Sequence, residues 1–179
     1  IKNMDILKKI CKKNKIFLVE DCAQSFGSIY KGKKSGYFSD VSAFSMNPMK
    51  ILSALGEAGA VSTSDKKIYE KLKILRYAGV NTKIEECIYP ELNHKIDTLQ
   101  ALVILNKLKS LSRVIKKRIT NAAYYNKYIN SKIKKPEFYK NFQHVYYTYQ
   151  IRCSKRDRLL KFLKKKGIET KIQHKKLLC

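Results

Sequence analysis

The feature that most constrains the fold is a continuous apolar run, IFLV, at residues 16–19, which ends on Glu20 and Asp21. A short run without polar alternation is typical of a strand that is buried on both faces of a parallel sheet. Open α/β sheets bind their ligands at the carboxyl ends of such strands. The run therefore predicts an α/β fold and places the two carboxylates at the edge where a site is expected.

The neighbouring segments fit the same kind of fold. Apolar residues recur at helical spacing over residues 2–14, before the first strand. Further strands are predicted at residues 41–45 and 60–63. A second helix is predicted over residues 65–77, and an irregular connection over 80–95. This order of helix, three strands and helix is that of part of an α/β layer.

The rest of the chain predicts a second, smaller α+β unit. Its expected elements are a helix, a strand, a lysine-rich helix and a short strand, at residues 97–130, 145–153, 155–166 and 168–172. The long helix is expected to break near residues 110–112. The predicted division is therefore into residues 1–110 and 111–179.

The net charge of +25 comes from 39 basic and 14 acidic side chains, and it is concentrated in the C-terminal part. Such a basic surface is able to attract nucleic acid or another anionic ligand. The alternative is a set of solvated, lysine-biased helix faces. Only 6 of the basic residues are arginine, whereas proteins that read bases rely on arginine. The composition therefore favours solvated faces, and nucleic acid is not the expected partner.

The sequence contains no signal for a membrane span, a disulfide framework or a metal site. Its longest apolar run, at residues 101–105, is far below the roughly 20 residues that a spanning helix needs. The histidines lack the spacing of metal ligands. Unpaired, scattered cysteines point to a reducing compartment, so a cytoplasmic location is predicted. These cysteines are Cys11, Cys22, Cys87, Cys153 and Cys179.

Four polar residues have the types that an enzyme needs to use pyridoxal phosphate (PLP): Asp21, Gln24, Ser45 and Lys50. An amine forms an imine with this cofactor, a carboxylate faces its pyridinium nitrogen, and a hydroxyl reaches its phosphate. Taken singly, these are also ordinary residues, such as a capping aspartate, a turn serine or a surface lysine. Their order and spacing favour the cofactor site.

Five segments in this order resemble the DegT/DnrJ/StrS family of sugar aminotransferases, which are fold-type I PLP enzymes. They cover roughly residues 15–130 and correspond to the E-D-x-A-Q strand end, the F-S-x-x-x-x-K segment, the G-E-G-G turn, the L-R-x-x-G segment and a helix start that ends in Q-A. In this chain they are residues 20–24, 44–50, 56–59, 75–79 and 93–101.

The resemblance implies a role for each candidate residue. Lys50 is expected to be the catalytic lysine that forms the imine with PLP. Asp21 is expected to face the pyridine nitrogen, and Gln24 the ring hydroxyl. Ser45 is expected to bind the phosphate. Asn93 matches an asparagine that reaches the phosphate bound by the neighbouring subunit, so a homodimer is expected.

The chain departs from the family pattern at several positions. Ala58 replaces a glycine of the G-E-G-G turn, and Ala78 stands where a histidine often precedes the glycine. Lys95 stands where arginine is more usual. His174 lies near a family H-Y motif, but Gln173 is an equally good match, so neither is assigned a role.

The resemblance implies an enzyme that transfers an amino group, with glutamate as the expected donor, to the keto group of a nucleotide-linked keto-deoxy sugar for amino-sugar or polysaccharide biosynthesis. Family members are about twice as long, so the chain is expected to lack an N-terminal part. Residues 1–110 are expected to belong to the PLP-binding large domain, and residues 111–179 to the small C-terminal domain. The alternatives are an inactive remnant of such an enzyme and, less favoured, a basic nucleic-acid-binding module.

Overall fold

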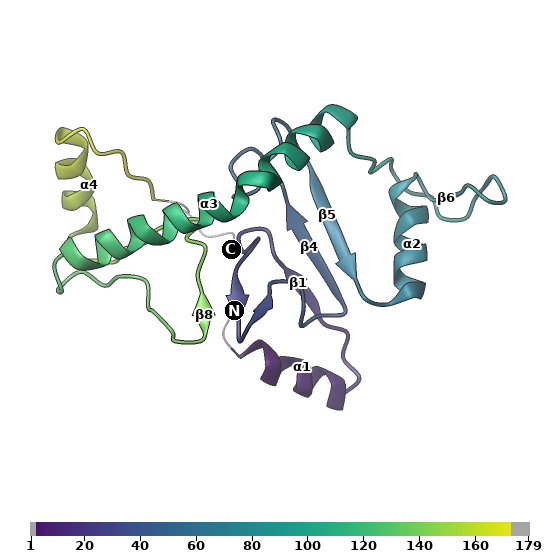
Figure 1. Ribbon diagram of the computed structural model, residues 1–179, viewed down its shortest axis with the longest axis horizontal. Coiled ribbons are helices and arrows are strands. Elements are labelled where there is room, and N and C mark those ends of the chain that lie inside the picture. The colour runs from purple at the N-terminus through teal and green to yellow at the C-terminus, as the bar shows by residue number, and fades with distance from the viewer. Residues whose placement is uncertain (1–2, 173–179) are drawn as a thin grey trace.

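The computed structural model describes residues 3–172, so the family match near Gln173 and His174 lies outside the described residues. Four helices are present in this part of the chain: α1 (Met4–Lys13), α2 (Lys66–Arg76), α3 (Thr98–Tyr128) and α4 (Arg156–Lys165). The strands are β1 (Val19–Asp21), β2 (Ile29–Tyr30), β3 (Lys33–Lys34), β4 (Val41–Ser45), β5 (Gly59–Thr63), β6 (Val80–Asn81), β7 (Glu86–Cys87) and β8 (Phe142–Gln143). Figure 1 shows how these elements are arranged.

The central sheet has the strand order β1-β4-β5. Strands β1 and β4 are parallel, with Asp21 opposite Ala43, whereas β4 and β5 are antiparallel. The α/β class is therefore confirmed, but the described part of the sheet is mixed. The expectation of a strand buried on both faces is wrong for these residues, because Val19 (57% exposed) and Asp21 lie on an exposed face of β1 and only Glu20 is buried.

Two small sheets were not predicted. Strand β2 pairs with β3 on one side and with β8 on the other, both antiparallel. Strands β6 and β7 form a hairpin within the connection that was expected to be irregular. Each of these strands has only two residues, which is too short for a periodic signal in the sequence.

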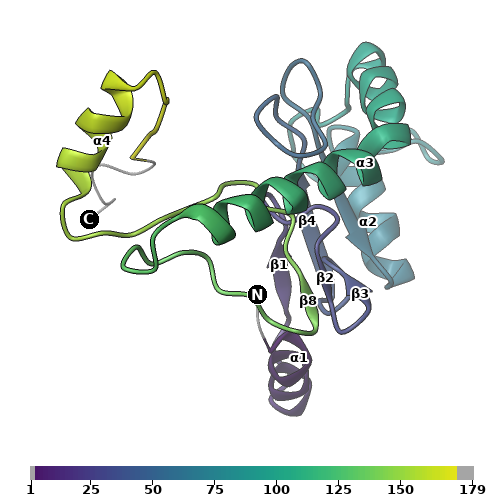
Figure 2. The same cartoon turned by 60° about the vertical axis from the view of Figure 1, so that its left-hand side comes forward.

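Helix α3 crosses the molecule above the central sheet, as Figures 1 and 2 show. Asp97 caps it by accepting a 2.7 Å hydrogen bond from the N–H of Leu99. The break expected near residues 110–112 is absent. Helix α3 continues through these residues, and the Ser110 hydroxyl donates to the Lys107 carbonyl within the helix. The predicted boundary between residues 110 and 111 falls inside this helix.

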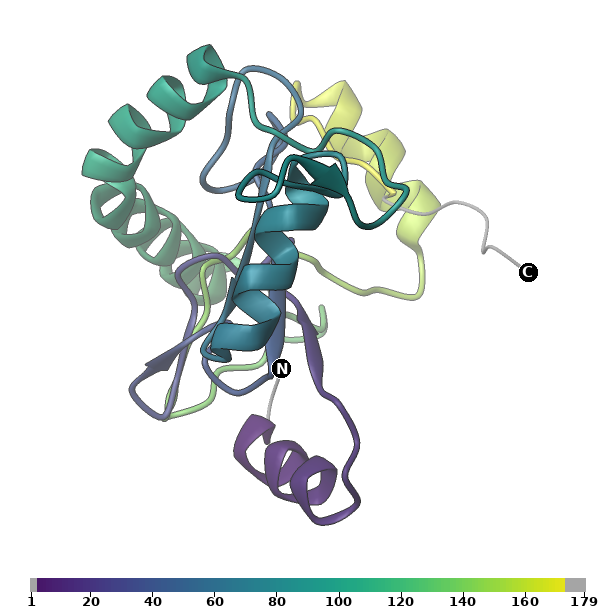
Figure 3. The same ribbon diagram turned by 90° about the vertical axis from the view of Figure 1, so that its right-hand side faces the viewer.

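The largest buried cluster lies where α3 covers the segment that follows β4. It joins Met46, Leu52 and Ala54 to Ile104 of α3. Helix α2 lies beside β5, the last strand of this sheet (Figure 1), and faces the viewer in Figure 3. The cluster holds the turn that carries Lys50 against the long helix.

The C-terminal segment does not form the separate α+β unit that the sequence predicted. The expected strand over residues 145–153 is an irregular segment with a bend at residues 147–148 and one isolated bridge, between Lys134 and Arg152. Residues 168–172 form no strand. Since β8 pairs with β2, the strand in this part of the chain belongs to a sheet of the N-terminal part. Helix α4 stands away from the sheets (Figure 2).

Candidate functional site

Asp21 and Ser45 lie at the carboxyl ends of two neighbouring parallel strands. Asp21 is opposite Ala43, and the N–H of Cys22 donates to the Ala43 carbonyl at 2.8 Å. Ser45 is two residues beyond Ala43, and side chains two residues apart point to the same face of a sheet. The structure therefore brings the Asp21 carboxylate and the Ser45 hydroxyl to one face at one edge.

Four hydrogen bonds, all made by Asn47, define the turn from Ser45 to Lys50. The N–H of Asn47 donates to Ser45 Oγ at 3.4 Å, and the N–H of Lys50 donates to the Asn47 carbonyl at 2.8 Å. Asn47 Oδ1 accepts from the N–H of Met49 at 2.9 Å, while its Nδ2 donates to Glu57 Oε1 at 2.5 Å. These bonds fix the turn, and with it the start of the lysine side chain.

The half-buried Lys50 side chain faces an aromatic ring from the distant C-terminal segment. Its Nζ lies 5.1 Å from the centroid of the Tyr147 ring, within the range of a cation–π contact. Arg118 Nη1 holds the backbone of this segment, with hydrogen bonds to the carbonyls of Tyr146 at 2.9 Å and Tyr147 at 3.4 Å. Sequence reasoning missed Tyr147, although the run of tyrosines around it was a visible signal.

Gln24 and Asn93 are exposed, and neither is hydrogen-bonded to Asp21, Ser45 or Lys50 among the described residues. Gln24 lies in the turn after β1, three residues beyond Asp21. Asn93 forms an isolated bridge with Tyr77 beside the end of α2, and its Oδ1 accepts from the N–H of Lys95 at 3.1 Å. No hydrogen bond or ion pair within residues 3–172 joins Asn93 to Lys50.

Helix α3 supports the turn that follows Lys50. Gln100 Oε1 accepts hydrogen bonds from the N–H groups of Leu55 at 2.8 Å and Gly56 at 2.9 Å. Lys107 Nζ donates to Ser53 Oγ at 3.0 Å. These contacts give the Q-A segment at the helix start a structural role beside the candidate site.

The two alanines that depart from the family pattern have different surroundings. Ala58 is half-buried against the core cluster, and its carbonyl accepts from the N–H of Met46 at 2.8 Å, so its methyl group adds apolar contact. Ala78 has a φ of 52°, in the left-handed region that favours glycine. The side chain of Ala58 is therefore easily accommodated, whereas the backbone of Ala78 is strained.

Cys22 follows Asp21 and is buried, with 1% of its surface exposed. Burial raises the pKa of its thiol, because the charged thiolate is desolvated. The side chain at this position therefore contributes to packing beneath the strand end.

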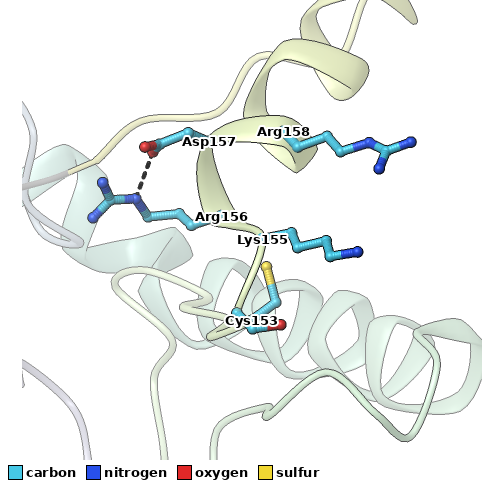
Figure 4. Close-up of a pocket in the computed structure, with 6 residues that line it drawn as sticks. Cys153, Lys155, Arg156, Asp157 and Arg158 are labelled. Atoms are coloured by element: carbon cyan, nitrogen blue, oxygen red, sulfur yellow. Dashed lines mark hydrogen bonds and ion pairs between the residues drawn. The ribbon is translucent and has the colours of Figure 1, made fainter.

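One open hollow in the described part of the chain lies away from these residues. It has a volume of about 490 Å³ and lies at the start of α4. An ion pair between Arg156 Nε and Asp157 Oδ1, at 2.8 Å, crosses one side of it (Figure 4). None of the five candidate residues lines it; the lining residues are Cys153, Ser154, Lys155, Arg156, Asp157 and Arg158.

Residues 3–172 contain neither a cluster of metal-binding side chains nor a membrane-spanning helix. No group of three or more His, Cys, Asp or Glu side chains is placed to hold a metal ion. No helix among these residues has the length and apolar character needed to cross a membrane.

The chain belongs to the DegT/DnrJ/EryC1/StrS aminotransferase family, whose model matches residues 1–178. One relative is the dTDP-3-amino-3,6-dideoxy-alpha-D-galactopyranose transaminase of Aneurinibacillus thermoaerophilus, 35% identical over 96% of this chain and 47% of the relative. Another is the GDP-perosamine synthase of Escherichia coli O157:H7, 30% identical over 94% of this chain and 47% of the relative. The chain thus spans about half the length of these curated relatives.

Solved structures agree with this assignment. The fold matches a DegT DnrJ EryC1 StrS aminotransferase from Brucella abortus with a TM-score of 0.95, at 29% identity, over 99% of this chain and 48% of that one. It also matches S. venezuelae DesV, solved in complex with a ketimine intermediate, with a TM-score of 0.89 at 31% identity, over 94% of this chain and 46% of that one.

Proposed function

We propose that the protein is a PLP-dependent aminotransferase that transfers an amino group to a nucleotide-linked keto-deoxy sugar. The observation that carries this proposal is the placement of Asp21, Ser45 and Lys50 at one edge of the sheet, in a chain that belongs to an aminotransferase family. Carboxylate, hydroxyl and amine are the three groups that the cofactor requires.

The residues present fit PLP by the chemistry of their donors and acceptors. We assign Lys50 as its covalent partner, Asp21 as the partner of the ring nitrogen, Gln24 as that of the ring hydroxyl, and Ser45 as a phosphate ligand. Asp21 and Gln24 are exposed at the edge of the sheet, so neither side chain is committed to the core. When bound, the cofactor supplies an electron sink for the carbon that gains or loses the amino group.

The chain's own residues perform the remaining steps. With the cofactor bound, the Asp21 carboxylate would accept a hydrogen bond from the protonated ring nitrogen and stabilise its positive charge. The Ser45 hydroxyl would donate to a phosphate oxygen. Lys50 Nζ, which follows a hydrogen-bonded turn, would act as the general acid–base that moves a proton from the amine-bearing carbon to the cofactor.

The names of the relatives support the proposed substrate class. The relative from A. thermoaerophilus is named as a transaminase of a dTDP-linked amino sugar, and the one from E. coli as the synthase of a GDP-linked sugar. Both names support a nucleotide sugar as the amino acceptor. We propose glutamate as the amino donor. The excess of basic side chains favours binding of a diphosphate, since opposite charge raises the rate of encounter.

Three further features of the whole protein belong to this proposal. Asn93, exposed and apart from Lys50, is suited to reach a second subunit, so we propose a homodimer. We assign residues 1–110 to a PLP-binding large domain. The assignment of residues 111–179 to a small domain is not kept, because α3 runs across the boundary and β8 pairs with β2. A cytoplasmic location stays a prediction.

Reductive trapping tests the proposal. The longest in-frame form of the protein is mixed with PLP, reduced with borohydride and digested, and the modified lysine is located by mass spectrometry. We expect the phosphopyridoxyl group on Lys50 and its loss in Lys50→Ala. Lys71→Ala is the matched control, because Lys71 Nζ also lies 5.1 Å from a tyrosine ring, that of Tyr89. A folded protein that is not modified, or is modified equally at many lysines, would overturn the proposal.

A further inference from the structure

Tyr147 is the one aromatic residue in the described part of the chain whose ring faces the Nζ of Lys50. The two residues are far apart in the sequence, and both are half-buried. We propose that Tyr147 positions the Lys50 amine whenever that amine is not bound to the cofactor. This inference rests on the proposed function, because it gives the ring a role in the steps in which Lys50 moves protons.

The segment that carries Tyr147 is fixed to α3 at several points. Arg118 donates to the carbonyls of Tyr146 and Tyr147, and the Tyr149 hydroxyl donates to Asn126 Oδ1 at 2.6 Å. Val145, on the same segment, is 2% exposed. The ring of Tyr147 is therefore held in place by a helix that also supports the turn after Lys50.

The backbone of this segment is strained next to the ring. Tyr146 has a φ of 48°, and its N–H donates to His144 Nδ1 at 2.7 Å. A bulky residue in the left-handed region is uncommon and persists where its surroundings enforce it. The strain lies beside Tyr147, where the proposal requires a defined geometry.

Lysine–tyrosine contacts are frequent in this lysine-rich chain, so the contact has to be distinguished from the others. Lys73 with Tyr69 and Lys127 with Tyr128 are local pairs on helix surfaces. Their rings are 53% and 62% exposed. The Tyr147 ring differs from these two because it is less exposed and because a separate segment brings it to the lysine. The contact of Lys71 with Tyr89 also joins separate segments, but Lys71 is exposed whereas Lys50 is half-buried.

The contact between Lys50 and Tyr147 has a strength that suits a reversible position of the amine. Within residues 3–172 no carboxylate forms an ion pair with Lys50, so the ring is the group that faces the cation. A cation–π contact of this kind changes an equilibrium by about two- to fivefold. That is enough to favour one orientation of the amine, and weak enough for the amine to leave when it reacts.

Trace acetylation measures the contact without the cofactor. The longest in-frame protein is treated with a small amount of acetic anhydride, and acetylation of each lysine is read by mass spectrometry. We expect Tyr147→Leu to raise acetylation of Lys50 about two- to fivefold relative to the other lysines, because the ring no longer covers the amine. Tyr147→Phe keeps the ring and is expected to restore the original value.

The matched control is Tyr69→Leu, which should change acetylation of Lys73 and leave that of Lys50 unchanged. Circular dichroism of each variant establishes that it is folded. Equal acetylation of Lys50 in the parent and in a folded Tyr147→Leu variant would overturn the contact.

A kinetic measurement tests the role of the contact in the reaction. With glutamate as donor, we expect Tyr147→Leu to lower kcat about two- to fivefold with a smaller change in KM, and Tyr147→Phe to restore it. An unchanged kcat in Tyr147→Leu would overturn the positioning role. Absence of trapping at Lys50 in the parent is a different result, because it would overturn the proposed function while leaving the acetylation measurement intact.

Discussion

The Glu20 carboxylate is buried and accepts a 3.2 Å hydrogen bond from the backbone N–H of Phe38. It also accepts from the N–H of Gly36 at 3.3 Å and from Ser39 Oγ at 3.0 Å. The Ser39 hydroxyl lies 2.7 Å from that of Ser42 on β4. A single side chain thus ties the end of β1 to the turn before β4, immediately beside the candidate residue Asp21.

We expect Glu20→Gln to lower the free energy of unfolding by about 1.5–3 kcal/mol. The substitution keeps the shape but replaces a charged acceptor of three hydrogen bonds with an amide that places a donor among donors. Urea unfolding followed by circular dichroism gives the value. Glu70→Gln is the control, since Glu70 forms only a partly exposed pair with Lys73 and should change stability by less than about 1 kcal/mol. Equal effects of the two substitutions would contradict the structural role of Glu20.

The positions of Asp21, Ser45 and Lys50 could be predicted from the sequence because they depend on local order. Two of them end apolar strands, and the third follows by a short turn. The contact of Lys50 with Tyr147 could not be predicted in this way. It depends on how a distant segment packs on α3, and the alternation in that segment resembled a strand.

The fold was predictable to the same extent. The helices carried strong periodic signals, and all four form close to the expected residues. The direction of β5 and the two-residue strands depend on pairing between segments, which periodicity does not report. Ser110 and Ser112 are weak helix formers, yet α3 continues through both, and the Ser110 hydroxyl bonds within the helix.

We expect Gly79→Ala to be strongly destabilising. Gly79 has a φ of +73°, and an added Cβ would lie 1.6 Å from the carbonyl oxygen of Tyr89. Gly32 is the matched control, because its φ is +75° but nothing lies within 4 Å of the added atom. Gly32→Ala should cost about 1–2 kcal/mol from its backbone alone, and Gly79→Ala more than about 3 kcal/mol. Similar unfolding curves for the two variants would show that the hairpin β6–β7 moves freely away from α2.

Acid unfolding should report the contact of α1 with the end of β2, in which Tyr30 and Lys31 donate hydrogen bonds to Asp5. The hydrogen bond from Lys31, then that from the Tyr30 hydroxyl, lowers the pKa of Asp5 from 3.8 to about 2. Because the folded pKa is the lower one, this stabilisation is present above pH 3.8 and is lost as the pH falls through about 2. We expect Asp5→Asn to flatten the dependence of melting temperature on pH in this window.

The ion pair between Asp5 and Lys31 is largely solvent-accessible. High salt should therefore reduce the difference in melting temperature between the parent and Asp5→Asn. Lys31→Met should flatten the same acid limb, since it removes the other partner. A melting temperature that depends on pH in the same way in the parent and both variants would contradict this account.

Thiol labelling should distinguish two cysteines by their burial. Cys22 is buried with a raised pKa, whereas Cys87 on the hairpin is exposed. We expect iodoacetamide to label Cys22 at least about tenfold more slowly than Cys87 in the folded protein. In urea both should react alike. Fast labelling of Cys22 without denaturant would mean that the end of β1 opens readily.

The proposed homodimer makes a prediction about mixed subunits. If Asn93 acts at the site of the neighbouring subunit, Lys50→Ala and Asn93→Ala are each inactive alone, but a mixed dimer contains one intact site. Unfolding and refolding an equal mixture should restore about a quarter of the parent's aminotransferase activity. The control pairs Lys50→Ala with Asp21→Asn, which should restore none, because Lys50 and Asp21 serve the same subunit's site. Recovery in both mixtures, or in neither, would contradict the assignment of Asn93 to the partner's site.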